Sequence, residues 1–165
     1  MYLLDTPIVF ALRQARSGAA DPGFVAWAAE VPRERLFVSA ISLVELEATV
    51  AQTMRRDKAA GTALRTWLDG QVVPAFEGHV LALDAAVARR RGQLALAETR
   101  DALLAATALE HGLTLVTRNL AAFKGARVKL FDPWGYQPSA QDEDSDWRTA
   151  GRSGPLWLRN LFVRT

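Results

Sequence analysis

The chain has 165 residues, half of them hydrophobic and 23% charged, which is the balance of a globular protein that packs its own core. It has no cysteine and only two histidines, which excludes disulfides, zinc–thiolate sites and cysteine nucleophiles. Any metal ion would have oxygen ligands, as magnesium and manganese prefer, and the net charge of +2 permits nucleic acid as a partner without requiring it.

The chain shows no signal for a membrane or for export. No apolar stretch approaches the roughly 20 residues that a membrane span needs, and residues 1–5 lack the basic and apolar regions of a signal peptide. We therefore expect a cytoplasmic protein that makes no membrane contact.

The first half of the chain predicts two strands, each followed by helices. Residues 2–4 form a short apolar run, and a helix is expected at residues 7–16, with Thr6 as its cap and Pro7 in its first turn. Further elements are a helix at 22–30, a strand at 36–39, a long helix from residue 42 and a helix at 60–70.

The second half predicts helices and strands in alternation. The expected elements are helices at 84–97 and 101–110, a strand at 113–117, a short helix at 119–123 and a strand at 128–131. Gly112 is placed to stop a helix. Strands that alternate with helices predict an α/β sandwich with a mostly parallel central sheet flanked by helices.

The composition changes after residue 134. Residues 137–154 are rich in Ser, Gly, Asp and Glu, and residues 156–163 are apolar again with interspersed arginine. We therefore divide the chain into a folded domain at residues 1–134 and a C-terminal linker with an apolar basic tail at 135–165. Our first hypothesis is that the tail docks on its own domain. The alternatives are that the tail extends a dimer or that it is an accidental extension of the reading frame.

Four polar residues are predicted to meet at one edge of the sheet: Asp5, Glu45, Asp101 and Asn119. Ligands of an open parallel sheet bind beyond the carboxyl ends of its strands. Carboxylates brought together there repel one another unless a divalent cation neutralises them. Such an ion supports in-line attack on a phosphodiester, so hydrolysis of that bond is the predicted chemistry.

Each of these residues also has a purely structural explanation. Asp5 and Asn119 are good helix caps, and Asp101 is favourable at a helix N-terminus. A lone Glu45 on an amphipathic helix is commonly a solvated side chain. The prediction of a site therefore depends on the four residues lying together.

Four segments of the chain resemble, in order, the motifs of the PIN-domain family. They are residues 2–6, 39–46, 101–108 and 115–119, and residues 131–134 resemble the end of the VapC and FitB-like toxin branch of that family. Four ordered motifs are far more specific than any one of them. The resemblance spans residues 1–134 and implies a PIN-like three-layer sandwich.

The resemblance also implies a function and the residues that carry it. Asp5, Glu45 and Asp101 would be the acidic metal-binding triad, with Asn119 at the fourth position, which is often an Asp. The supporting residues would be Thr6 and Thr117. A member of this family would be a Mg²⁺- or Mn²⁺-dependent ribonuclease, the toxin of a toxin–antitoxin pair, with RNA as substrate. It would form a homodimer or higher oligomer and bind a cognate DNA-binding antitoxin.

Two positions depart from the family pattern. Pro7 stands where Asn or Ser is common, and Ala122 stands where many members carry a further acid. Three carboxylates and one neutral amide predict a single metal ion in the free protein. The departures also keep open a second hypothesis, a catalytically weakened PIN fold that binds RNA or a protein partner.

Basic residues for contacts with RNA phosphates are spread along the chain. The candidates are Arg13, Arg16 and Arg118, with Arg55, Arg56 and Lys58 at the end of the long helix. A solvated helix face explains residues 55–58 equally well. A receiver domain or an aspartyl phosphatase is a further alternative, but residue 7 is a proline where such a site needs an acid beside Asp5.

Overall fold

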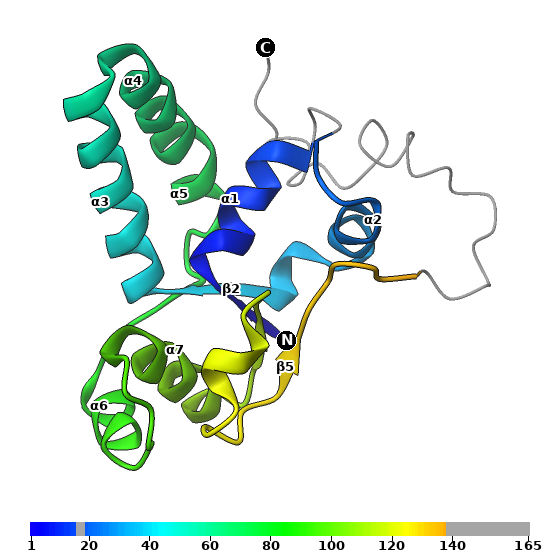
Figure 1. Cartoon of the computed structure of the whole chain (residues 1–165), viewed down its shortest axis with the longest axis vertical. Helices are drawn as coiled ribbons and strands as arrows, with labels where there is room; N and C mark the ends of the chain where they lie inside the picture. The colour runs from blue at the N-terminus through cyan, green and yellow to red at the C-terminus, as the bar shows by residue number, and fades with distance from the viewer. Residues whose placement is uncertain (16–18, 138–165) are drawn as a thin grey trace.

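The protein is an α/β sandwich around one parallel sheet, as Figure 1 shows for a computed structural model that describes residues 1–15 and 19–137. The sheet order is β3-β2-β1-β4-β5, and every neighbouring pair is parallel. The strands are β1 (Tyr2–Leu4), β2 (Leu36–Ser39), β3 (Val80–Leu81), β4 (Thr114–Val116) and β5 (Leu130–Phe131). The predicted fold class is therefore confirmed.

Helices cover both faces of this sheet. They are α1 (Thr6–Gln14), α2 (Pro22–Glu30), α3 (Ala40–Arg56), α4 (Lys58–Trp67), α5 (Val73–Ala75), α6 (Ala85–Gly92) and α7 (Thr99–Glu110). Short helical turns occur at Arg33–Arg35, Leu68–Val72 and Leu120–Phe123. Figure 1 shows α1 to α4 on one side of the sheet and α6 and α7 on the other. None of the helices in the described residues combines the length and apolarity needed to cross a bilayer.

Alternating side chains of the central strands build the two cores. Leu4 and Val116 belong to the larger cluster, which includes Trp67 of α4, whereas Leu3 and Leu115 belong to the second cluster beneath α7. Successive side chains of a strand point to opposite faces, so neighbouring residues of one strand fill different layers. This alternation makes the fold a three-layer sandwich.

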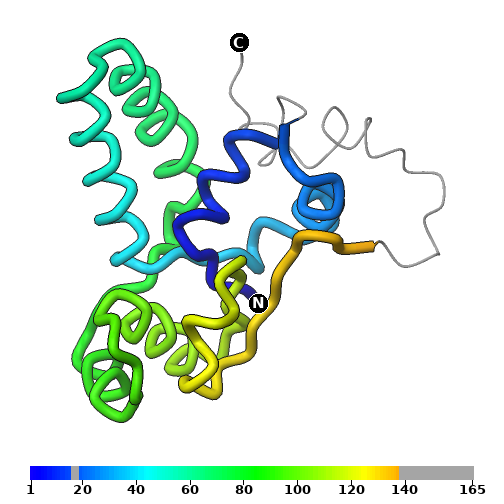
Figure 2. The backbone as a smooth tube through the Cα atoms, in the orientation of Figure 1, coloured from blue at the N-terminus to red at the C-terminus, as the bar shows by residue number. Residues whose placement is uncertain are grey.

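The α3–α4 pair is a helical hairpin that projects from the sheet, as the tube in Figure 2 shows. Asp57 links the two helices by accepting a hydrogen bond from Ala60 N at 3.0 Å, as the N-cap of α4. Arg65 of α4 pairs with Glu47 of α3 at 2.7 Å. The two helices therefore form one unit, and the first turns of α3 lie at the edge of the sheet where β2 ends.

Several predicted boundaries were wrong. The helix expected at 84–97 ends at Gly92, because Leu94 and Leu96 pack on the second core cluster from an irregular segment. The helix expected at 101–110 begins two residues earlier, at Thr99, while the long helix expected from near residue 42 begins at Ala40. Strand β3 was missed, since two partly exposed residues give no periodic signal.

The prediction that Thr6 caps the first helix was also wrong. Asp5 is the N-cap of α1, because its Oδ1 accepts a hydrogen bond from Thr6 N at 2.8 Å. Gly112 does stop α7, with a φ of 63° that favours glycine. Arg16 and residues 138–165, which hold most of the predicted linker and tail, lie outside the described residues.

Candidate active site

The sheet topology brings the predicted carboxylates to one edge. Asp5 directly follows the central strand β1, and Thr117 follows the neighbouring strand β4. Strand β2 ends at Ser39 and leads into α3, whose second turn carries Glu45. Helix α7 precedes β4 and returns to the same edge, so Asp101 in its first turn arrives beside the other two.

Asp5 is the fixed member of the group. Its side chain is buried, with only 3% of the residue exposed. One carboxylate oxygen accepts from Thr6 N at 2.8 Å, and the other accepts from Thr117 Oγ1 at 2.7 Å. Two donors, one in α1 and one in the residue that follows β4, therefore set the orientation of this carboxylate.

Glu45 and Asp101 complete an acidic triad. The hydroxyl of Thr6 donates to Glu45 Oε2, which ties α3 to the start of α1. Asp101 lies one residue after Arg100, and its Oδ1 accepts from Arg100 Nη1 at 2.8 Å. The structure thus brings together the three acids that the sequence singled out.

Arg100 is the site residue that sequence reasoning missed. Its Nη2 donates to Asp5, its Nε donates to Glu45 Oε1 at 2.8 Å, and its Nη1 donates to Asp101. All three carboxylates therefore contact one guanidinium. In the sequence, Arg100 is marked only by its position directly before Asp101. That position alone does not distinguish an arginine in the site from one exposed to solvent.

Ionisation in the site reflects this packing. Partial burial alone would raise the pKa of Glu45, but hydrogen bonds from Arg100 and Thr6 outweigh it and hold that pKa below its ordinary value. Burial would lower the pKa of Arg100, yet its bonds to Glu45, Asp101 and Asp5 raise it. The site therefore favours an ionised Glu45 beside a charged guanidinium.

Asn119 reaches the site through its backbone. Its N–H donates to Thr117 Oγ1 at 3.1 Å, and that hydroxyl in turn donates to Asp5. The side-chain oxygen of Asn119 accepts from Ala122 N at 3.4 Å as the cap of the short helical turn. Asn119 is thus next to the acids, with its side-chain oxygen engaged in a cap.

Two of the arginines predicted to contact RNA, Arg118 and Arg13, lie on aromatic rings. Arg118, beside Thr117, places its guanidinium 4.5 Å from the centroid of Trp134. Arg13 lies 5.7 Å from the centroid of Trp67, at the end of α1 that is far from Asp5. The structure therefore places Arg118 next to the site and Arg13 away from it.

The donor set suits a hard divalent ion, because carboxylate oxygens are the ligands that Mg²⁺ and Mn²⁺ prefer. The three acids already converge on one positive charge, that of Arg100. Across residues 1–15 and 19–137, however, no group of three His, Cys, Asp or Glu side chains is arranged to hold an ion directly. The chemistry of the site fits a metal ion, while its present spacing fits a guanidinium.

Comparison with known proteins identifies the family. The model of the PIN domain family matches residues 2–127. The chain belongs to the PIN-domain family. This PIN domain is 32% identical to Toxin FitB of Neisseria gonorrhoeae over 142 residues, which cover 81% of this chain and 99% of that toxin. It is 33% identical to VapC ribonuclease Y4jK of Sinorhizobium fredii, over 81% of this chain and 98% of that protein.

Solved structures agree with the family assignment. The crystal structure of FitAcB from Neisseria gonorrhoeae contains a chain that matches with a TM-score of 0.72 at 30% identity, over 81% of this PIN domain and 99% of that chain. A chain in the crystal structure of VapBC2 from Rickettsia felis, bound to a DNA fragment from its promoter, also matches. Its TM-score is 0.55 and its sequence identity is 21%, so this match supports the fold alone. The expected resemblance to the VapC and FitB-like toxins is thereby confirmed.

Proposed function

We propose that this chain is a metal-dependent ribonuclease and the toxin of a toxin–antitoxin pair, acting in the cytoplasm. The observation that carries the proposal is the convergence of Asp5, Glu45 and Asp101 on a single cation at the carboxyl edge of a parallel sheet. The relatives named as a VapC ribonuclease and as Toxin FitB support RNA as the substrate and toxin as the role.

In this proposal, the acids bind the metal ion and the two threonines position Asp5. Asp5, Glu45 and Asp101 would hold a Mg²⁺ or Mn²⁺ ion, with Asn119 beside them. Thr117 and the backbone of Thr6 hold the Asp5 carboxylate in place before substrate arrives. When bound, the ion supplies activation of the attacking water and stabilisation of the charge that develops on the phosphate.

Arg118 is the best-placed residue for the RNA backbone. It follows Thr117 at the sheet edge, and its guanidinium is supported on the Trp134 ring. A guanidinium on an aromatic surface binds phosphate through directed hydrogen bonds. Arg13 is a secondary candidate, since it lies at the far end of α1.

Cleavage of a mixed RNA pool by the purified protein tests this function. We expect cutting with Mg²⁺ or Mn²⁺ and none with EDTA, because the carboxylates alone supply no countercharge for the phosphate. Folding in EDTA is checked by circular dichroism. If the folded protein binds RNA yet cuts none with any metal, the proposal is wrong and the second hypothesis, an RNA- or partner-binding PIN fold, takes its place. The guanidinium between the acids is the feature that favours that second hypothesis.

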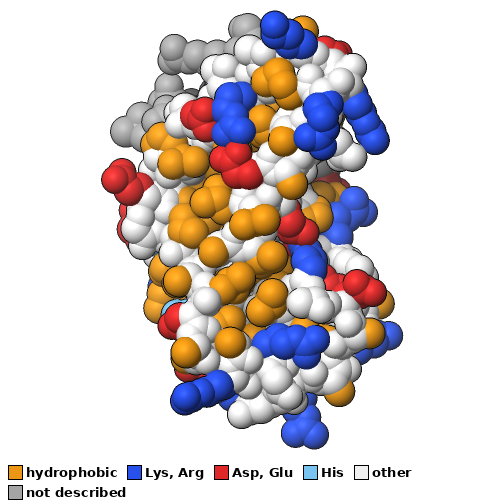
Figure 3. Space-filling view, turned by 90° about the vertical axis from the view of Figure 1, so that its left-hand side faces the viewer, with side chains coloured by type: hydrophobic (Ala, Val, Ile, Leu, Met, Phe, Trp, Pro, Cys, Tyr) orange, Lys and Arg blue, Asp and Glu red, His pale blue; other side chains and the backbone are white. Residues whose placement is uncertain are grey.

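We further propose protein partners, a cognate antitoxin and a second copy of this chain. A matched structure, that of FitAB bound to a DNA fragment, supports an antitoxin that binds DNA. Hydrophobic side chains also gather on the face of the molecule shown in Figure 3. Apolar surface of this kind in a monomer marks a contact with another protein.

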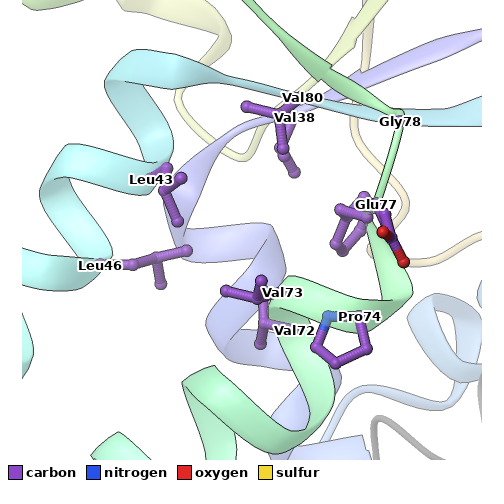
Figure 4. A pocket seen from close by; sticks show the side chains of 10 residues that line it. Val38, Leu43, Leu46, Val72, Val73, Pro74, Glu77, Gly78 and Val80 are labelled. Atoms are coloured by element: carbon purple, nitrogen blue, oxygen red, sulfur yellow. The ribbon is translucent and has the colours of Figure 1, made fainter.

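An apolar pocket of about 280 Å³ supports a contact near the first turns of α3. Figure 4 shows Leu43 and Leu46 of α3 facing Val72 and Val73 across it. The nearby exposed apolar residues are Val44, Val73 and Val80, which are 60%, 45% and 40% exposed. We assign this surface to the homodimer.

Val44→Glu tests the dimer assignment. Val44 is exposed, so the change should leave the fold intact, but a charge in a buried apolar interface lacks a partner and weakens association. We expect light scattering after size-exclusion chromatography to give a dimer for the wild type and a monomer for Val44→Glu. The control is Ala59→Glu on the exposed start of α4. A dimer that persists in Val44→Glu would move the interface elsewhere.

A further inference from the structure

One guanidinium satisfies three carboxylates at the site. Arg100 makes four hydrogen bonds there, two to Glu45 and one each to Asp5 and Asp101. Its three nitrogens are all used, and each acid has at least one of them as a partner. A planar fork with several donors is suited to such a role, whereas a lysine ammonium is a point charge.

We propose that Arg100 is a built-in countercation of the acidic triad, which must withdraw before a divalent metal ion binds. This inference rests on the proposed function, because it concerns the same carboxylates. The inference adds that Arg100 and the metal ion compete for the same three carboxylates. The metal affinity of the free protein is then set by Arg100 as well as by the acids.

The contacts of the acids with Arg100 support the competition. Ligand oxygens lie about 2.0 to 2.1 Å from a Mg²⁺ ion, whereas here each carboxylate is a hydrogen bond away from a nitrogen of the guanidinium, at 2.8 Å for Glu45 and Asp101. In the part of the chain that the structure describes, no three acids are close enough to chelate an ion. The carboxylates must close in to hold a metal ion, and the guanidinium between them prevents it.

The mobile partner in this competition is Arg100 rather than Asp5. The Asp5 side chain is 4% exposed and is held by two further donors, Thr6 N and Thr117 Oγ1. The Arg100 side chain is 29% exposed and lies in the first turn of α7, after the irregular segment that follows α6. Its long side chain can move toward solvent while the backbone stays in place.

In both states a cation offsets part of the negative charge of the three acids. With Arg100 in place, the repulsion among the three acids is reduced by its positive charge. With a divalent ion in place, the acids are neutralised further and Arg100 is released. While Arg100 occupies the site, a metal ion cannot bind there. The apparent affinity for the ion is therefore reduced in proportion to the fraction of molecules in which Arg100 has withdrawn.

Titration of the purified protein with Mn²⁺ by isothermal calorimetry tests the proposal. The variants are Arg100→Met, which keeps an unbranched, flexible side chain without its charge, and Arg100→Lys. The control is Arg90→Met, since Arg90 pairs with Glu110 away from the site. We expect Arg100→Met to bind Mn²⁺ about tenfold more tightly than the wild type, within the usual range of coupling between sites.

A second readout separates competition from a structural role. Without metal, Arg100→Met should melt at a lower temperature than the wild type, because its acids have lost their countercation. Mn²⁺ should then raise the melting temperature of Arg100→Met more than that of the wild type, in proportion to its tighter binding. Arg90→Met should behave as the wild type in both measurements. Arg100→Lys, which keeps a charge and so protects the fold, should bind Mn²⁺ more tightly than the wild type.

The outcomes distinguish this inference from the proposed function. If both Arg100 variants bind Mn²⁺ no more tightly than the wild type, while EDTA abolishes RNA cleavage, the competition is wrong and the nuclease stands. If no variant binds Mn²⁺ and the wild type cuts no RNA, both fail. Tighter binding in Arg100→Met with an unchanged Arg90→Met supports the competition directly.

Discussion

Asp5→Asn is expected to lower the rate of RNA cleavage by about a thousandfold while the protein stays folded. Metal-assisted catalysis stabilises a transition state by several kcal/mol, and each 1.36 kcal/mol is about tenfold in rate. The neutral amide removes one of three charges that hold the ion. It keeps an oxygen that can accept from Thr6 N, so α1 retains its N-cap.

The matched control is Asp84→Asn. Asp84 is also a helix cap, because its Oδ1 accepts from Val87 N at 2.9 Å at the start of α6. The same chemical change there should leave cleavage within about twofold of the wild type, as expected for a cap replaced by another good cap. Cleavage is measured at saturating Mg²⁺, and RNA binding is measured by fluorescence anisotropy. Full activity in Asp5→Asn would contradict the assignment of the triad.

The acids of the site were predictable because topology decides where they go. In a parallel sheet, a residue that follows a strand lies at the carboxyl edge of the sheet. The first turn of a helix that leads into a strand lies at the same edge. Asp5 and Asp101 are related in this way to β1 and β4. Their joint placement needed only the order of strands and helices, which the alternation of apolar and polar runs already indicated.

Arg100 and the side chain of Asn119 were not predictable in this way. The direction of a long arginine depends on which anions lie within its reach, and those come from residues 95 and 55 positions away in the chain. The amide of Asn119 had two possible uses, a cap and a ligand, and the structure uses its oxygen as a cap. Local sequence cannot weigh such alternatives, because each depends on tertiary packing.

The fold was predictable where segments are long and periodic. The long helix α3 has a strong pattern, and its start was predicted to within two residues. Strand β3 has two residues and pairs only at Val38 and Ser39, so its existence depends on an edge offered by β2. The end of α6 likewise depends on a core contact, made by Leu94 and Leu96.

Gly61→Ala shows most sharply how packing reverses a rule drawn from sequence. A glycine inside a helix costs roughly 0.5 to 1 kcal/mol relative to alanine, so the sequence alone predicts that alanine would stabilise α4. In the structure, a methyl group on Gly61 would lie 2.6 Å from the backbone nitrogen of Met54 and still closer to its Cα. Backbone atoms of α3 cannot give way as a flexible side chain can.

We therefore expect Gly61→Ala to lower the free energy of unfolding by about 1 to 3 kcal/mol, the usual cost of overpacking. Thermal denaturation followed by circular dichroism measures the effect. Gly70→Ala is the matched control, because a methyl group there meets no atom within 4 Å, and it should be neutral or stabilising. Since α3 also carries Glu45, separation of the hairpin in Gly61→Ala should weaken the acidic site as well. A melting temperature equal to that of Gly70→Ala would mean that α3 and α4 are not in close contact at this point.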